Sequence, residues 1–134
     1  MNGLKINIEN MNKFFLQTGI ILAGLSVAIG AFGAHSFKAF LELNNQMNNY
    51  ETAARYQIYG GLALILTGIL TERFKNKFMS LAGQSFVLGT IIFAGALYLI
   101  CGTGIKMFGA IAPIGGTGMM LGWIFLFLGV QKED

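Results

Sequence analysis

Charged residues are scarce in this chain. Lysine and arginine account for 9 of its 134 residues and aspartate and glutamate for 6, so that only 11% of the chain is charged, whereas a soluble domain carries about 25%. Hydrophobic residues make up 54%, more than a soluble domain of this size can bury in one core. The composition therefore excludes an ordinary soluble domain and predicts apolar surface that is covered by lipid.

The residues that most often carry chemistry are scarce as well. A single cysteine, Cys101, excludes an intrachain disulfide, and we expect its thiol to be buried and inert. A single histidine, His35, makes a poor metal site without a cluster of carboxylates or thiols. The sequence also lacks a Ser/His/Asp set, a phosphate-binding loop, paired carboxylates and a CxxC motif. We therefore expect no enzymatic activity, no cofactor and no metal.

What the chain does contain is four long hydrophobic blocks. A bilayer core about 30 Å thick needs about 20 helical residues to cross it, and three of the blocks have that length. The second block is shorter, but its helix can begin upstream, near Tyr50. We predict an all-α integral membrane four-helix bundle that forms a single domain over residues 1–134, with spans at about residues 14–34, 52–71, 78–101 and 108–130.

A short amphipathic segment, residues 35–46, separates the first two spans. Its apolar residues share one helical face and its charged residues the other: Phe37, Phe40 and Leu41 against Lys38 and Glu42. This pattern is typical of a helix that lies flat at the membrane interface.

The start of the second span carries polar and aromatic signals. Asn48 followed by Glu51 resembles a capping box, and Glu51 with Arg55 forms an i,i+4 pair of opposite charge in the favourable order. We interpret Glu51 and Arg55 as an ion pair that fixes the second helix, or alternatively as a lipid headgroup site with Arg55 on the phosphate. Tyr50, Tyr56 and Tyr59 suggest an interfacial aromatic belt.

The basic residues predict the orientation in the membrane. With four spans, both termini and the loop over residues 72–77 lie on one side. That side carries Lys5, Lys13, Arg73, Lys75, Lys77 and Lys132, and the other side carries Lys38, Arg55 and Lys106. Because basic residues are enriched in cytoplasmic loops, we expect both termini inside. We interpret these charges as determinants of the orientation in the membrane. The sequence has no basic stripe interleaved with aromatic residues, so we expect no nucleic-acid partner.

Small residues recur at helical spacing in the first and fourth spans. The first span has the pairs Gly19/Ala23, Gly24/Ala28 and Gly30/Ala34. The fourth span has Gly115, Gly122 and Gly129 seven residues apart, and Gly118/Gly122 as a GxxxG pair next to Trp123. Such stripes let helix backbones approach closely in lipid. They predict helix–helix contact, either within the chain or between subunits.

Pro113, followed by Gly115 and Gly116, falls early in the fourth span. Proline removes a backbone hydrogen bond and clashes with the preceding turn, so we expect a packing kink here. The alternative is a broken helix whose free carbonyls bind an ion.

Three motifs together resemble those of domain-of-unknown-function family 423, which is related to the transmembrane protein 256-like proteins. The motifs are GAFGAH at residues 30–35, YETAARYQ at residues 50–57, and APIGG at residues 112–116 with Gly122 and Trp123. The resemblance covers roughly residues 14–130. It implies a four-helix bacterial plasma-membrane protein with no established activity, and it singles out His35, Glu51, Arg55, Tyr56, Gln57, Pro113, Gly115, Gly116 and Trp123.

The chain departs from the family pattern at Gly60, where a histidine is usual, and at Ala94 and Ala96, where serines are expected. These departures weaken any two-histidine site for a metal, for haem or for proton transfer. Because the topology gathers the motif residues at the outer interface, we expect His35, Glu51, Arg55, Gln57 and Pro113 to form one polar network there.

These features favour a non-enzymatic protein that organises or stabilises the membrane, or a partner complex, through helix packing and lipid contact. Its expected partners are membrane lipids and a second copy or another membrane protein. The alternative is an oligomeric channel or passive carrier for a small solute, built around the fourth helix. A weaker hypothesis makes it an accessory subunit of a redox complex with His35 as a ligand.

Overall fold

The computed structural model describes the backbone of residues 2–132 and the side chains of residues 10–132. In this part of the chain the regular elements are all helical: α1 (Asn2–Ala34), α2 (Lys38–Leu43), α3 (Met47–Thr71), α4 (Lys77–Thr103), the 3-10 helix η1 (Lys106–Ala110) and α5 (Ala112–Gln131). Four segments are long and apolar enough to span a membrane, namely Asn10–Ala34, Met47–Thr71, Lys77–Thr103 and Lys106–Gln131. The predicted all-α fold with four membrane helices is confirmed.

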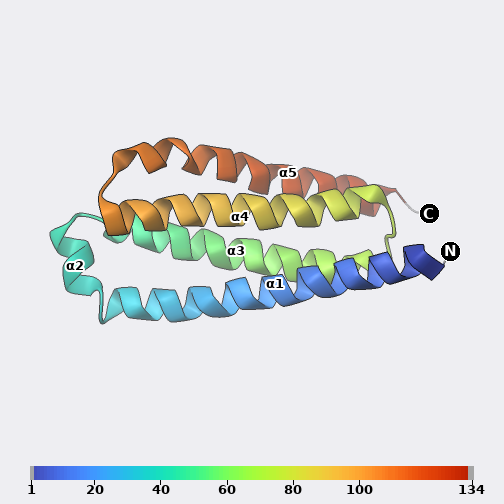
Figure 1. Cartoon of the computed structure of the whole chain (residues 1–134), viewed down its shortest axis with the longest axis horizontal. Helices are drawn as coiled ribbons and strands as arrows, with labels where there is room; N and C mark the ends of the chain where they lie inside the picture. Colours follow the sequence, from blue (N-terminus) through green and yellow to red (C-terminus); the bar gives the residue numbers. More distant parts are fainter. Residues whose placement is uncertain (1, 133–134) are drawn as a thin grey trace.

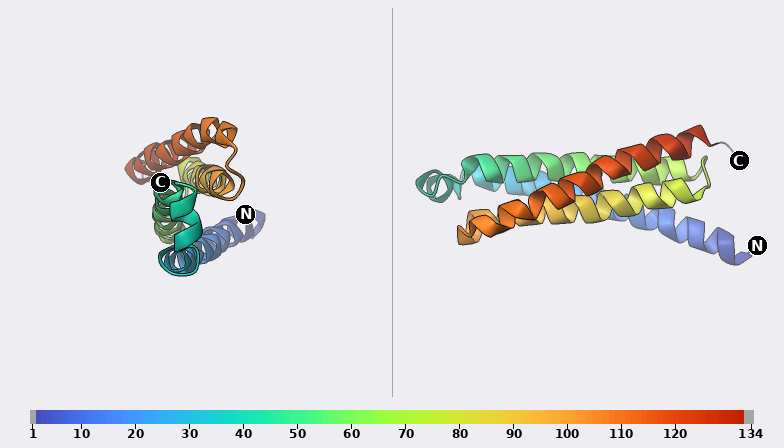
Figure 2. Two further views of the ribbon diagram at one scale, coloured as in Figure 1. Left: turned by 90° about the vertical axis from the view of Figure 1, so that its left-hand side faces the viewer. Right: turned by 90° about the horizontal axis from the view of Figure 1, so that it is seen from above.

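The four long helices lie side by side in the order α1, α3, α4, α5 (Figures 1 and 2). The main helix contacts are α1 with α3, α3 with α4, and α4 with α5. Half of the apolar stretch of α3 and 44% of that of α4 is buried, against 17% for α1 and 28% for η1–α5. The inner pair, α3 and α4, therefore forms the centre of the bundle, and α1 and α5 present most of their apolar surface to the surroundings.

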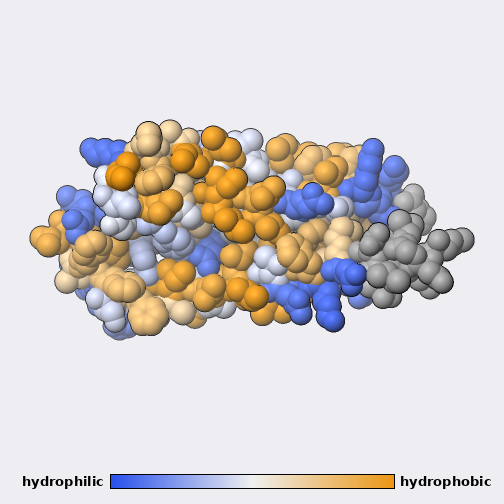
Figure 3. Space-filling model, in the orientation of Figure 1, coloured by the Kyte–Doolittle hydropathy of each residue, from blue (hydrophilic) through white to orange (hydrophobic). Residues whose placement is uncertain are grey.

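Polar groups gather at the two ends of the bundle. The start of α1 and the end of α5 lie at one end, and α2 runs across the other (Figure 1). On the face shown in Figure 3, apolar residues cover the middle and hydrophilic residues lie mostly towards the ends. This distribution is the one expected of helices that cross a hydrocarbon layer and end in water.

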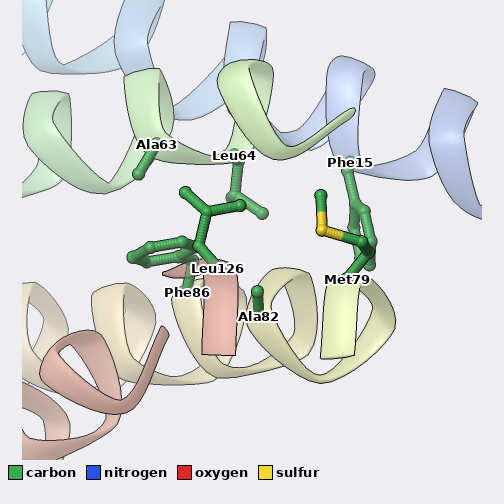
Figure 4. Close-up of a cluster of buried hydrophobic side chains, with 7 residues drawn as sticks. All are labelled: Phe15, Ala63, Leu64, Met79, Ala82, Phe86 and Leu126. Atoms are coloured by element: carbon green, nitrogen blue, oxygen red, sulfur yellow. The ribbon is translucent and has the colours of Figure 1, made fainter. Parts of the chain in front are cut away.

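A cluster of buried side chains from all four long helices lies in the half of the bundle where α4 begins (Figure 4). Its members are Phe15, Ala63, Leu64, Met79, Ala82, Phe86 and Leu126. Phe15 is the contribution of α1, and its ring lies over Gly83 of α4. Because Gly83 has no side chain, a phenyl ring from α1 can reach the inner helix α4.

Local sequence signals explain where α4 begins and ends. Asn76 caps its N-terminus by accepting a hydrogen bond from the backbone N–H of Phe78 at 3.1 Å. The Asn76 side chain also donates to the carbonyls of Gly129 and Lys132, which ties the start of α4 to the end of α5. Gly104 ends α4 with φ +71°, in the left-handed region that glycine adopts without steric cost.

Two expectations about helix starts are wrong. Pro113 lies in the first turn of α5, and the fourth span is interrupted just before it, where the separate 3-10 helix η1 ends at Ala110. The span is therefore broken at this point, as the alternative interpretation had it, and is not a continuous helix with a kink. In a first turn the missing N–H of proline costs nothing, because that position has no partner within the helix. The capping box is absent as well, since Gln46 precedes α3 and Asn48 lies inside it, with no side-chain cap bond.

Candidate functional site

The glycines of α5 pack within the chain, against α4. A side chain at Gly115 would clash with the backbone of Phe93, and one at Gly122 would lie 2.6 Å from the ring of Phe86. A side chain at Gly118 would lie 3.0 Å from the Cα atom of Gly89. Of the two alternatives for this stripe, contact within the chain is therefore the one observed.

Gly116 and Trp123 lie at the edge of the same contact. A methyl group at Gly116 would meet the Phe93 ring at an ordinary distance of 3.6 Å. Trp123 is half exposed, and its ring stands edge-on to Phe86 with 5.0 Å between ring centroids. The only tryptophan of the chain thus reports on the contact between α4 and α5.

A polar hollow of about 550 Å³ lies at the α2 end of the bundle, between α1, α2 and α3. Its lining combines small residues of α1 and α3, which we call its floor, with two basic and two acidic side chains, which we call its rim. The floor residues are Gly30, Gly33, Ala34 and Ala54, and the charged residues are Lys38, Glu42, Glu51 and Arg55. We call this site the charged hollow.

The expected ion pair between Glu51 and Arg55 is not formed. Both side chains are exposed, and among the described residues neither takes part in a salt bridge or hydrogen bond. An exposed i,i+4 pair gains only about 0.3–0.5 kcal/mol, which is little against the entropy of holding two long side chains in one geometry. Arg55 therefore contributes to the charged hollow and not to a fixed pair.

His35 is not part of the charged hollow. It is exposed in the turn between α1 and α2, where its backbone N–H donates to the carbonyl of Phe32 at 3.2 Å. No group of three or more histidine, cysteine, aspartate or glutamate residues in the described part of the chain is placed to hold a metal ion.

Gln57 belongs to a different polar group, inside the bundle. It is 4% exposed; its amide donates to the carbonyl of Leu22 at 2.9 Å and accepts from the hydroxyl of Tyr98 at 2.7 Å. Gln57 thus links α1, α3 and α4 through side-chain hydrogen bonds. The expectation of one outer network joining His35, Glu51, Arg55, Gln57 and Pro113 is wrong, because Gln57 points into the bundle and the other polar side chains point outward.

Tyr50 is a structural residue that the aromatic-belt interpretation missed. It is 8% exposed, its hydroxyl donates to the carbonyl of Ile29, and its ring lies over Gly33 of α1. Tyr56 and Tyr59 do lie on the exposed side, where their rings meet edge-on. The sequence signal that distinguishes Tyr50 from Tyr56 and Tyr59 is Gly33 on the facing helix α1. Because Gly33 has no side chain, the ring of Tyr50 can pack against it.

A second, apolar recess of about 470 Å³ lies on the other side of α2, against α3 and α4. Phe37, Phe40 and Leu41 line it, together with Tyr50, Tyr98, Cys101 and Gly102. The Cys101 thiol is buried in its wall, 3.7 Å from the carbonyl of Gln46. The two predicted faces of the amphipathic segment therefore line two different hollows. Its apolar residues line this recess, and Lys38 and Glu42 line the charged hollow.

Comparison with known proteins agrees with this architecture. The family described as a protein of unknown function, DUF423, matches residues 29–116. A UPF0382 membrane protein of Staphylococcus haemolyticus is 37% identical over 120 residues, which cover 90% of this chain and 97% of the relative. The UPF0382 membrane protein YwdK of Bacillus subtilis is 31% identical over 121 residues, 90% of this chain and 98% of the relative. No solved structure matches the chain.

The family match spans the charged hollow, Gln57 and the start of α5. These relatives are bacterial and are named as membrane proteins, and four apolar helices of this chain are long enough to be spans. This chain is a multi-pass membrane protein and belongs to the DUF423 family.

Proposed function

We propose that this chain is a non-enzymatic multi-pass protein of the bacterial plasma membrane. In this proposal it organises or stabilises the membrane, or a partner complex, through helix packing and lipid contact. The observation that carries it is the exposure of the outer helices, since only 17% of the apolar stretch of α1 is buried within the chain. Large side chains such as Ile20, Leu25 and Val27 are more than half exposed, and an apolar surface of this extent requires lipid or another membrane protein.

The polar side chains inside the spans support a role in packing. Gln57 and Tyr50 of α3 both donate hydrogen bonds to backbone carbonyls of α1. Hydrogen bonds of this kind hold helices together in lipid, where an unmade bond is costly. A second copy of the chain, or another membrane protein, is the partner we propose for α1.

A channel lined by the glycines of α5 receives no support from this arrangement. Gly115 and Gly122 are buried against α4, so neither is free to face a pore between subunits. A bulky residue at either position would disturb the bundle itself and would not report on solute flux.

Native mass spectrometry of the protein released gently from its own membrane tests the proposed function. We expect a mass that includes bound phospholipid, or a discrete oligomer or partner, because the outer helices are otherwise uncovered. A monomer that carries neither lipid nor protein would contradict the proposal. A stoichiometric adduct that is neither lipid nor protein would instead indicate a cofactor, and with it a chemical role.

We further propose that both termini lie in the cytoplasm and α2 lies outside. Single-cysteine variants in a Cys101→Ala background test this orientation. With Ser36→Cys, next to α2, we expect a membrane-impermeant maleimide to label intact cells. With Lys75→Cys, between α3 and α4, we expect labelling only after the membrane is opened. Both positions are exposed, so the reverse pattern would show the opposite orientation.

A further inference from the structure

The charged hollow contains four charged side chains that form no ion pairs or hydrogen bonds with the described part of the bundle. Lys38 and Glu42 lie one turn apart on α2, and Glu51 and Arg55 lie one turn apart on α3. Within the described residues, none of the four forms a salt bridge or a side-chain hydrogen bond. Two cations and two carboxylates therefore line one hollow with their bonding capacity free.

The floor of the charged hollow is shaped by missing side chains. A methyl group added at Gly30 would find open space, with no atom within 4 Å. The ring of Tyr50 lies over Gly33, and both residues line the hollow. A smooth apolar floor below a charged rim is suited to an amphiphile at the membrane interface.

We propose that the charged hollow binds the headgroup of a zwitterionic glycerophospholipid that carries a phosphate and a primary ammonium group, as phosphatidylethanolamine does. Lys38 and Arg55 would bind the phosphate, and Glu42 and Glu51 would accept hydrogen bonds from the ammonium group. The proposal rests on the lipid contact proposed above and names the lipid class at one site.

Charge complementarity favours this headgroup over the two other common kinds. An anionic glycerol headgroup brings one negative charge to a rim that already holds two carboxylates, and it offers no cation to them. A choline headgroup has no N–H to donate, and it is best recognised by a cage of aromatic faces. Among the residues that the structure describes, Tyr50 is the one aromatic residue that lines the charged hollow.

The test uses the full chain in detergent micelles, with ethanolamine, glycerol and choline phospholipids of identical acyl chains. Native mass spectrometry gives the fraction of protein bound to each lipid at equal concentration. We expect the ethanolamine lipid to bind roughly two- to fivefold better than the others, the range that corresponds to one exposed charge pair. Equal binding of all three, or preference for the glycerol lipid, would overturn the proposal.

Filling the floor provides a steric test that leaves the charges in place. We expect Gly30→Leu to abolish the ethanolamine preference, because the new side chain occupies the hollow. Gly24→Leu is the matched control, since it lies on the same helix, is also exposed and also has open space around it, but lies outside the hollow. A preference that survives Gly30→Leu, or that Gly24→Leu also removes, would contradict the assignment.

The charges are tested by a double variant, Glu42→Gln with Glu51→Gln. We expect it to bind the glycerol lipid at least as well as the ethanolamine lipid, because the ammonium contacts and the repulsion of the anionic headgroup are lost together. An ethanolamine preference that survives in the double variant would contradict the assignment of Glu42 and Glu51. Failure of the headgroup assignment is distinguishable from failure of the proposed function. In the first case the purified protein still carries lipid or a partner without headgroup preference, and in the second it carries neither.

Discussion

Gly115→Ala should destabilise the bundle by about 2–3 kcal/mol, the upper part of the range for an overpacked contact. The added methyl group would run into the backbone of Phe93 and would lie 2.8 Å from the carbonyl oxygen of Gly89. Backbone atoms in the middle of α4 cannot move aside as the end of a flexible side chain can. The two helices must therefore separate, and much of the contact between α4 and α5 weakens with them.

Equilibrium unfolding in mixed micelles measures this effect, with the fluorescence of Trp123 as the signal. Trp123 lies on α5 against Phe86 of α4, so it responds to the contact that the substitution opens. Gly89→Ala should cost a similar amount, because its methyl group would lie 2.5 Å from the backbone nitrogen of Met119. A stability of Gly115→Ala equal to that of the unmodified protein would show that α4 and α5 do not pack as described.

Gly116→Ala is the matched control for Gly115→Ala. It makes the same chemical change one position further along α5, where the nearest atom of Phe93 is 3.6 Å away. Alanine also has a higher helix propensity than glycine, by about 0.8–1.0 kcal/mol. We therefore expect Gly116→Ala to leave the stability unchanged or to raise it slightly.

The long hydrophobic blocks were sufficient to predict four membrane helices, because the need to satisfy backbone groups in lipid leaves few alternatives. The spacing of small residues also identified contact surfaces, but it could not say which of them are used. Gly19 of α1 packs against the backbone of Gly61, whereas Gly24, five residues later, has open space around it. The difference depends on where α3 lies, and that is set by the whole bundle and not by the local pattern.

The candidate site was also predictable only in part, because the local pattern does not say where the neighbouring helices lie. The amphipathic pattern of α2 placed Lys38 and Glu42 on one face, and both line the charged hollow. The helical period places Glu51 and Gln57 about 120° apart around α3, but it could not say which side of α3 faces the bundle. The helical turn directs Glu51 to the rim and Gln57 into the bundle, where α1 and α4 provide its partners. The residues of the motif at 50–57 are therefore divided in the structure between a surface site and the core of the bundle.

Gln57→Leu should also destabilise the bundle strongly, by about 2 kcal/mol. The substitution removes two interhelical hydrogen bonds at once, to Leu22 of α1 and from Tyr98 of α4. Interhelical hydrogen bonds in membranes contribute about 0.6 kcal/mol on average, so their loss explains only part of the effect. The larger part comes from the Tyr98 hydroxyl, which stays at a partly buried site without an acceptor.

This account makes a specific prediction for the double variant Gln57→Leu/Tyr98→Phe. Removing both partners of a buried hydrogen bond costs less than removing one, because no polar group is left unsatisfied. We therefore expect the double variant to be more stable than Gln57→Leu alone, in the same unfolding assay. Additive losses would show instead that the two side chains act independently and that the hydrogen bond between them contributes little.

Gln84→Leu separates this effect from the loss of any glutamine amide. Gln84 lies exposed on α4, and in the described part of the chain its amide has one partner, the hydroxyl of Ser80, to which it donates at 3.0 Å. Its substitution should change the stability by less than about 0.5 kcal/mol, as for most surface changes. A large loss for Gln57→Leu beside a negligible one for Gln84→Leu would mean that the link between α1, α3 and α4, and not the amide as such, stabilises the inner part of the bundle. The hydrogen bond from Gln57 to the carbonyl of Leu22 would then be an important polar contact between α1 and α3. Because α1 and α3 also enclose the charged hollow, the same bond would help to fix the distance between its walls.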